Sequence, residues 1–326
     1  MSSPLLSIII CTRNRARSLR ETLACFERLE IPADYGAELL VVDNASTDQT
    51  EDVVRRRRFA NLNVRYLREN TPGLSWARNT GLAASAGEII LFTDDDVRPS
   101  PGWARGMCQP LLSGKADAVA GGVTVAPGLL TPWMTLWVRA TLAATDSINP
   151  VTPERMVGAN MAFSRRVLAR VPAFDAELGA GPCQLGAAEE TLFTYQLAEA
   201  GYRIASAFDV NVEHHLDPSR LTRRALLGAC ERAARSEAYV AWHWAHESPQ
   251  VCDRSLRSYK RDLKLWAKLL RHRINAAARH DAPPIDDWEI QLVKALFFRR
   301  QYRIEMLRPR NYDRRGFTKR AVRKVA

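Results

Sequence analysis

In the N-terminal part of the chain, short apolar runs alternate with stretches in which apolar residues have helical spacing. This alternation restricts the possible folds more than any other feature of the sequence. The runs at 5–10 and 39–42 are typical of strands buried on both faces of a sheet, and 64–67 and 88–93 are predicted as a third and a fourth strand. Between them, apolar residues recur every three or four positions, as they do on helices that cover a sheet. The pattern predicts an α/β fold with a parallel sheet covered on both faces.

Three of these predicted strands end in a polar residue. Thr12 follows the first run, Asp43 the second and Asp94 the fourth. The carboxyl ends of parallel strands lie at one edge of the sheet, and ligands of such folds bind outside that edge. We therefore expect these three side chains to converge on one binding site.

The net charge of +11 is unevenly distributed along the chain. Residues 221–326 hold 25 Lys and Arg against 11 Asp and Glu, whereas residues 1–220 hold 22 against 25. Apolar residues at 256–274 recur every three or four positions, which predicts an amphipathic helix with a basic opposite face. We therefore expect an α/β domain at 1–220 and a basic helical extension at 221–326. Such a charge favours an acidic partner, such as nucleic acid or an anionic membrane surface.

Cysteine usage and hydropathy indicate the cellular compartment. The six cysteines are scattered without a CxxC pair, as is typical of reduced thiols in a cytosolic protein rather than of a disulfide framework or zinc site. The N-terminus lacks the basic start and long apolar run of a signal peptide, and no stretch of about 18 apolar residues is free of charge. We expect a cytoplasmic protein that is neither secreted nor membrane-spanning.

Three consecutive aspartates, Asp94, Asp95 and Asp96, end the fourth predicted strand. Adjacent carboxylates repel one another and raise each other's pKa unless a cation neutralises them. Oxygen ligands of this kind suit Mg²⁺ or Mn²⁺, which are often bound through one or two carboxylates and the phosphates of a substrate. The three aspartates can therefore be interpreted either as a divalent-cation site or as a solvated acidic turn.

Four motifs, in this order, give the chain a resemblance to a known family. They are SIIICTRNR at 7–15, VVDNASTDQT at 41–50, GLSWARNTGLAASAGEIILFTDDD at 73–96 and AEETLF at 188–193. Together they resemble the inverting family-2 glycosyltransferases, which have the GT-A fold and use nucleotide-diphosphate sugars. The resemblance covers about residues 5–220 and implies a Rossmann-like GT-A domain with a mostly parallel sheet.

The resemblance implies roles for residues on the nucleotide side of the site. Thr12 and Arg13 would line the nucleotide pocket, and Asp43 would accept a hydrogen bond from the base. Arg78, in the ARN motif, would lie near the nucleotide or its diphosphate. Asp94 would hold the ribose or a water on the metal. Asp95, in the middle of the DxD motif, is assigned to the donor-binding residues.

The same resemblance implies a metal site. Asp96 would coordinate a Mn²⁺ or Mg²⁺ ion that bridges the diphosphate, with Asp94 as a further candidate ligand. A histidine at the end of a late strand often completes the metal shell in GT-A enzymes. His214 fits this position best, with His215 as the alternative, and a plain surface histidine is the other interpretation.

The catalytic base is implied by the Glu189-Glu190 pair. The family usually has Glu-Asp here, with the second residue as general base, so the role falls on Glu190 and Glu189 is the alternative. A carboxylate within about 3 Å of an acceptor hydroxyl can take its proton during attack on the anomeric carbon.

Four further residues have both a functional and a structural interpretation. Trp103, Trp133 and Trp137 could form a platform for a sugar ring, although aromatics at this spacing are more often core residues. Asn160 could lie near the donor sugar or have a structural role.

The predicted function is metal-dependent, inverting transfer of a hexosyl or related group from a nucleotide-diphosphate sugar. The acceptor would be a glycan or lipid-linked hydroxyl, in the synthesis of a surface polysaccharide or glycoconjugate. A nucleotidyltransferase is the alternative enzyme, but the glycine-rich phosphate loop it should carry is missing from residues 7–17. A nucleic-acid-binding protein is the non-enzymatic alternative.

The basic extension at 221–326 has either a solvated helical face or a peripheral contact with anionic lipid at the inner face of the cell membrane. It has no zinc-finger or helix-turn-helix signature, and we expect no nucleic acid as its partner.

Overall fold

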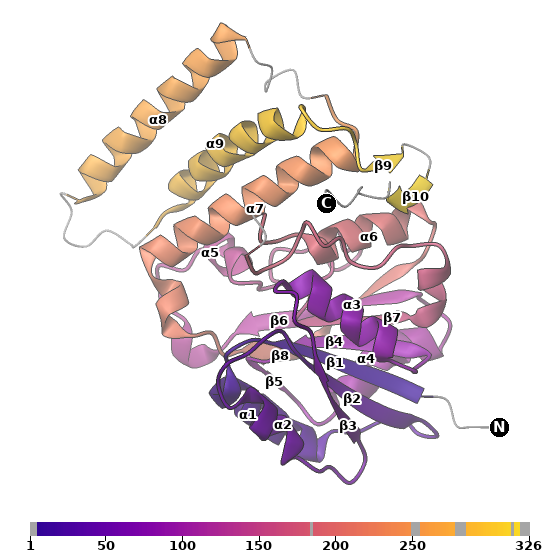
Figure 1. Cartoon of the computed structure of the whole chain (residues 1–326). Coiled ribbons are helices and arrows are strands. Elements are labelled where there is room, and N and C mark those ends of the chain that lie inside the picture. The colour runs from indigo at the N-terminus through magenta and orange to yellow at the C-terminus, as the bar shows by residue number, and fades with distance from the viewer. Residues whose placement is uncertain (1–4, 183–184, 249–254, 278–284, 314–315, 320–326) are drawn as a thin grey trace. The chain divides into compact units, whose positions relative to one another are not determined.

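The computed structural model describes residues 5–182, 185–248, 255–277, 285–313 and 316–319 (Figure 1). The chain forms two compact units. The α/β unit comprises Met1–Leu130, Leu142–Cys183 and Glu189–Leu216, and the helical unit comprises Thr131–Thr141, Gln184–Ala188 and Asp217–Ala326. Two short segments from within the first 220 residues thus group with the C-terminal part. The division into domains at residue 220 stays a prediction.

One eight-stranded sheet forms the centre of the α/β unit, in the order β3-β2-β1-β4-β7-β6-β8-β5. Strands β3, β2, β1 and β4 are parallel, as the alternation of runs and helices predicts. The other half is mixed, because β7 is antiparallel to both β4 and β6, and β5 is antiparallel to β8. The strands are β1 Leu5–Thr12, β2 Gly36–Asp43, β3 Asn63–Arg68, β4 Ile89–Asp94, β5 Val97–Pro99, β6 Ala118–Val125, β7 Asn160–Ser164 and β8 Ile204–His214.

The buried strands explain why the apolar runs are continuous. Ile8, Ile9 and Ile10 of β1 alternate between the two faces of the sheet and are all fully buried, so both faces are covered. The helices of this unit are α1 Ala16–Cys25, α2 Thr50–Arg55, α3 Leu74–Ala84, α4 Trp103–Leu112 and α6 Glu189–Glu199, with short 3₁₀ turns at Phe26–Arg28, Pro127–Leu129 and Arg165–Ala169.

Strand register brings the predicted polar ends together. Thr12 of β1 is paired with Asp43 of β2, and Cys11 of β1 is paired with Asp94 of β4. The three strand ends therefore lie side by side at one edge of the sheet. This confirms that the three strand ends meet at one edge, as the sequence predicts.

The helical unit consists mainly of long helices. The helix predicted at 256–274 is confirmed, and it extends to Ala277. Thr222 and Asp286 cap α7 and α9 by accepting hydrogen bonds from Ala225 N and Glu289 N. None of the described helices is both long and apolar enough to cross a membrane. The elements of the helical unit are α5 Leu136–Thr141, a 3₁₀ turn at Pro218–Leu221, α7 Arg223–His243, α8 Leu256–Ala277, α9 Asp287–Glu305, β9 Tyr312–Asp313 and β10 Gly316–Lys319.

Candidate active site

Asp95 is the centre of a hydrogen-bond network at the carboxyl edge of the sheet. Thr12 Oγ1 donates to Asp95 Oδ2 at 2.6 Å, and the hydroxyls of Ser18 and Thr22 donate to the Asp95 carbonyl at 3.0 and 2.7 Å. Burial raises the pKa of the Asp95 carboxyl to about 6, against the opposing effect of Arg15. The middle aspartate thus ties β4 to β1 and α1.

Arg15 is a further candidate site residue, which no local sequence pattern marks. Its Nη1 atom is 3.0 Å from Asp95 Oδ1 and 2.7 Å from Asp96 Oδ2. The backbone reaches this position through Asn14, which has a left-handed φ of 52°. One guanidinium therefore neutralises two of the three aspartates, whose mutual repulsion the sequence had already indicated.

Asp94, Asp96 and His214 form a second cluster at the same edge. One ligand atom from each lies within 4.8 Å of the others. The Asp96 backbone carbonyl accepts from His215 N at 2.8 Å, which holds the end of β8 beside the triple aspartate. The ring of His215 lies instead beside Glu213, 3.2 Å away, and is partly exposed. The structure brings His214, and not His215, to the carboxylates.

The two ring nitrogens of His214 have different surroundings. Nδ1 lies 3.1 Å from the carbonyl oxygen of Leu142, which can only accept, so Nδ1 carries the proton. Nε2 lies 3.0 Å from Asp96 Oδ1 but forms no hydrogen bond with any described residue. An imidazole lone pair and a carboxylate oxygen at this separation suit a shared cation.

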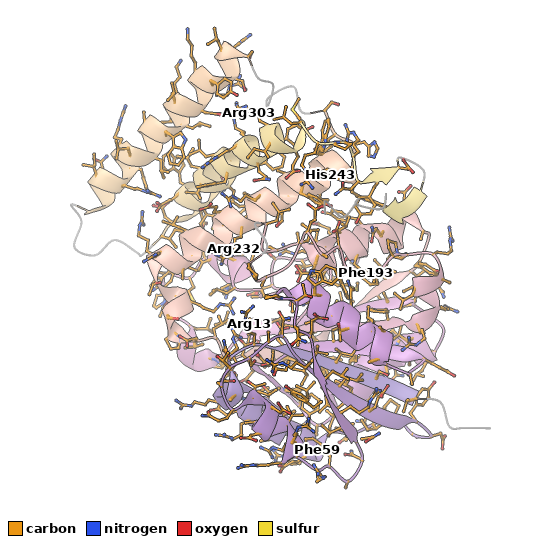
Figure 2. The ribbon with its side chains drawn as sticks, in the orientation of Figure 1. Arg13, Phe59, Phe193, Arg232, His243 and Arg303 are labelled. Carbon is orange, nitrogen blue, oxygen red and sulfur yellow. The ribbon has the colours of Figure 1, made fainter. Side chains whose placement is uncertain are left out.

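Asp43 is buried and engaged by its own neighbours. Its Oδ1 accepts from Ser46 N at 2.8 Å, and its Oδ2 accepts from Tyr66 Oη at 2.6 Å and Arg68 Nη1 at 3.2 Å. Burial, together with the hydrogen bond to Asp43, raises the pKa of Tyr66 to about 12. Arg13, by contrast, is exposed just beyond β1 (Figure 2).

Arg78 and Glu189 form a buried ion pair, and each is less than 5% exposed. The Arg78 guanidinium also lies over the rings of Phe92 and Phe174, 5.9 and 5.4 Å from their centroids. A Cβ atom at Gly158 would lie 1.8 Å from Arg78 Nη2, so only glycine leaves room for this guanidinium. Arg78 is thus held in the interior by a partner 111 residues away.

Glu190 differs from its neighbour Glu189. Its Oε2 atom is buried and forms no hydrogen bond with a described residue. Burial raises the pKa of Glu190 to about 8, with Glu189 adding to the increase and Arg78 opposing it. Arg78 also interacts electrostatically with Asp94, so the glutamate pair and the aspartates belong to one charged region. Of the two glutamates, Glu190 has an oxygen available for a new proton.

Trp103 and Asn160 are structural residues. Trp103 is fully buried, and its Nε1 donates to Asn160 Oδ1 at 2.8 Å. Asn160 Nδ2 donates to one carbonyl of β6 and one of β8, each at 2.8 Å, so the amide cross-links three strands. A role in sugar contact is therefore wrong for both. Trp133 and Trp137 belong to the helical unit, where Trp137 is 47% exposed.

The chain is similar in part to known glycosyltransferases. Chondroitin synthase from Escherichia coli is 36% identical over 118 residues, which are 36% of this chain and 17% of the relative. The glycosyltransferase AglE from Haloferax volcanii is 33% identical over 121 residues, 37% of this chain and 40% of the relative. The matches span less than half the length of either relative.

A solved structure shares the fold over most of the chain. The mannosyltransferase PcManGT from Pyrobaculum calidifontis, in complex with GDP-Man and Mn²⁺, superposes with a TM-score of 0.59. The alignment covers 94% of this chain and 88% of that protein at 20% identity, so it shows a common GT-A fold. The family model described as glycosyl transferase family 2 matches residues 7–171, about half of the chain. The chain therefore belongs to glycosyl transferase family 2.

Proposed function

We propose that the protein is an inverting glycosyltransferase that uses a nucleotide-diphosphate sugar and a divalent cation. The observation that carries this proposal is the cluster of Asp94, Asp96 and His214 at the carboxyl edge of the sheet. Thr12 and Asp43 occupy the same edge, where ligands of open α/β sheets bind. The mannosyltransferase with the same fold was solved with GDP-Man and Mn²⁺.

The donor set fits such a cation. Asp94, Asp96 and His214 would hold it, with two carboxylates and the Nε2 atom of an imidazole. Imidazole is a poorer ligand for Mg²⁺, which prefers oxygen, than for the later transition metals, so we favour Mn²⁺ over Mg²⁺. A cation bound there would offset the negative charge that develops on the leaving diphosphate.

Glu190 supplies the general base in this proposal. Its Oε2 atom accepts the proton of the acceptor hydroxyl while the hydroxyl oxygen bonds to the anomeric carbon. The bond from that carbon to the diphosphate oxygen breaks in the same displacement, so the configuration inverts. A pKa of about 8 suits a base that works near neutral pH.

The other site residues have supporting roles in the proposal. Thr12 and Asp43 are assigned to the nucleotide side, and Arg13, exposed just after β1, would contact the nucleotide. Arg15 can offset charge on the diphosphate from its place beside Asp95 and Asp96.

Arg78 is a positioning residue. It fixes Glu189 by the buried ion pair and thereby orients the start of α6, where Glu190 follows. This role differs from direct contact with the diphosphate, which its burial disfavours.

The acceptor is proposed to be a glycan or lipid-linked hydroxyl of a surface polysaccharide. The supporting relatives are named for such products, among them chondroitin synthase and the poly(ribitol-phosphate) β-N-acetylglucosaminyltransferase TarS of Staphylococcus aureus, 36% identical over 91 residues. These residues are 28% of this chain and 16% of TarS.

A donor screen tests the function directly. Nucleotide sugars with UDP and GDP carriers are incubated with Mn²⁺, Mg²⁺ or EDTA, and donor consumption and the anomeric configuration of the released sugar are followed by NMR. We expect cation-dependent consumption of one donor class with inversion. Retention of configuration, or full turnover in EDTA, would contradict the proposal. UDP or GDP with Mn²⁺ should raise the Tm, whereas a rise with DNA or RNA would favour a nucleic-acid-binding protein.

A further inference from the structure

Helix α8 carries a continuous row of large apolar side chains that face solvent. Residues three, four and seven apart share one face of an α-helix. Each member of this row, here called the apolar stripe, is between 43% and 80% exposed. One exposed leucine is ordinary, but a row along the whole helix marks a surface that contacts something apolar. The apolar stripe consists of Leu256, Tyr259, Leu263, Trp266, Leu270 and Ile274.

A different face of α8 packs on α9. Asp262 accepts hydrogen bonds from Arg299 and Arg303 of α9, and Arg299 Nη2 donates to Ser258 Oγ at 2.9 Å. Leu269, on the same face, is buried. This face lies about a third of a turn from the middle of the apolar stripe. The helix is thus held by one face while the apolar stripe remains outside.

Positive charge runs beside the apolar stripe. Six exposed basic side chains, here called the basic row, extend along α8, and no described carboxylate forms an ion pair with them. The first four line a surface hollow of about 420 Å³. Asp262, the single acidic residue of α8, is engaged by the arginines of α9. The basic row consists of Arg257, Lys260, Arg261, Lys264, Lys268 and Arg271.

We propose that α8 lies in the plane of an anionic lipid bilayer surface. The apolar stripe enters the boundary of the acyl chains, and the basic row contacts the lipid phosphates. Helices that bind in this way combine Leu and Trp on one face with Lys and Arg on the other. A second copy of the chain would bring a second basic row to the same interface, where like charges repel. This assigns the attachment predicted for 221–326 to one helix, and it does not depend on the transfer reaction.

Vesicle flotation with the full chain tests the proposal. The vesicles are phosphatidylcholine alone, or phosphatidylcholine with about a third of phosphatidylglycerol. We expect flotation with the anionic vesicles and at least tenfold weaker binding to the neutral ones. The double variant Leu263→Ser/Leu270→Ser should lose at least tenfold in affinity for the anionic vesicles. Lys260→Glu/Lys264→Glu should do the same.

Matched variants elsewhere separate α8 from general surface effects. Leu112→Ser/Leu130→Ser removes two exposed leucines of the α/β unit, 43% and 46% exposed. Arg56→Glu/Arg58→Glu reverses two exposed charges beyond α2. Both controls should bind anionic vesicles like the wild type.

Three outcomes would overturn the proposal: no flotation of the wild type, unchanged flotation of both α8 variants, or equal loss in the matched controls. Light scattering after gel filtration adds a further test. If Leu263→Ser/Leu270→Ser dissociates a dimer and leaves flotation unchanged, the apolar stripe is an interface between copies. Circular dichroism and Tm of the α8 variants should match the wild type, because the replaced side chains are exposed.

Donor consumption without lipid distinguishes this proposal from the proposed function. The α8 variants should consume donor in solution at the wild-type rate. A wild-type protein that floats with anionic vesicles but consumes no donor would contradict the enzyme function and leave the lipid-binding helix in place.

Discussion

Two buried histidines, one in each unit, face a carboxylate at the same distance and differ in what the other ring nitrogen contacts. Nε2 of His243 (labelled in Figure 2) lies 3.0 Å from Glu305, and its Nδ1 accepts a hydrogen bond from Asn311 N. Nε2 of His243 therefore carries the proton and donates it to Glu305. In His214 the proton is on Nδ1, and Nε2 meets Asp96 at 3.0 Å without a hydrogen bond.

This difference in hydrogen bonding distinguishes the structural pair of His243 and Glu305 from the candidate binding site at His214. Around His243 each polar atom has the partner it needs, and Glu305 accepts further hydrogen bonds from Gln301 and Arg308. Around His214 and Glu190, buried atoms remain that can take a cation or a proton. Burial and distance alone would place the two histidines in one class, and only the tautomer distinguishes them.

The largest effect on turnover is expected for Glu190→Gln. Loss of the base should lower kcat by about 10³-fold, while the affinity for the nucleotide stays within threefold of wild type. Pre-steady-state and steady-state kinetics with the cognate donor measure both. A variant with near-normal kcat would place the base elsewhere.

Glu189→Gln is the matched control for this variant. It leaves the Arg78 guanidinium buried without its ion-pair partner, so we expect a loss of folding stability that Glu190→Gln does not show. Urea unfolding of the two variants measures the contrast. Equal destabilisation would remove the distinction between the two glutamates.

The variants His214→Ala and His243→Ala test the comparison of the two buried histidines most directly. Loss of a ligand should weaken Mn²⁺ binding by about 10–100-fold in His214→Ala. His243→Ala should leave Mn²⁺ binding unchanged and lower the free energy of unfolding by about 3 kcal/mol, because Glu305 stays buried without this partner. If the two variants exchanged these effects, the tautomer assignment would be wrong.

A smaller effect is expected from pH. The pKa of Glu190 is raised from 4.5 to about 8, so kcat/KM should increase about tenfold per pH unit below 8 and level off above it. The folded state holds this proton more tightly than the unfolded state. Stability from this group is therefore greatest below pH 4.5 and falls as the pH rises to about 8.

Glu190→Gln provides the control for that pH dependence. It should remove the decline in stability between pH 4.5 and 8, as measured by urea unfolding at several pH values. A decline that persists unchanged in this variant would assign it to another group.

The strands and the site edge could be predicted because both depend on local patterns. A continuous apolar run marks a doubly covered strand, and a polar residue at its end marks the edge where ligands bind. Thr12, Asp43 and Asp94 were found in this way, and the register of β1 with β2 and β4 places them side by side. The roles proposed for Glu190 and His214 rest on the family resemblance instead.

The long-range partners could not be predicted from local patterns. Arg15 meets Asp95 from 80 residues away, and Arg78 meets Glu189 from 111. Neither spacing has a local signature, because the turn at Asn14 and the space left by Gly158 decide where each guanidinium goes. The antiparallel pairing of β7 with β4 and β6 was not predicted for the same reason, since β7 lies far from β4 in the sequence.

The most direct test of the account is a Mn²⁺ titration followed by electron paramagnetic resonance, with wild type and Asp96→Asn compared in the presence of UDP or GDP. Asp96 lies in the cluster with Asp94 and His214, so the account predicts one Mn²⁺ ion per wild-type chain and at least tenfold weaker binding in the variant. Equal Mn²⁺ affinity in the two proteins, or no binding by the wild type, would contradict the assignment of this cluster as the cation site.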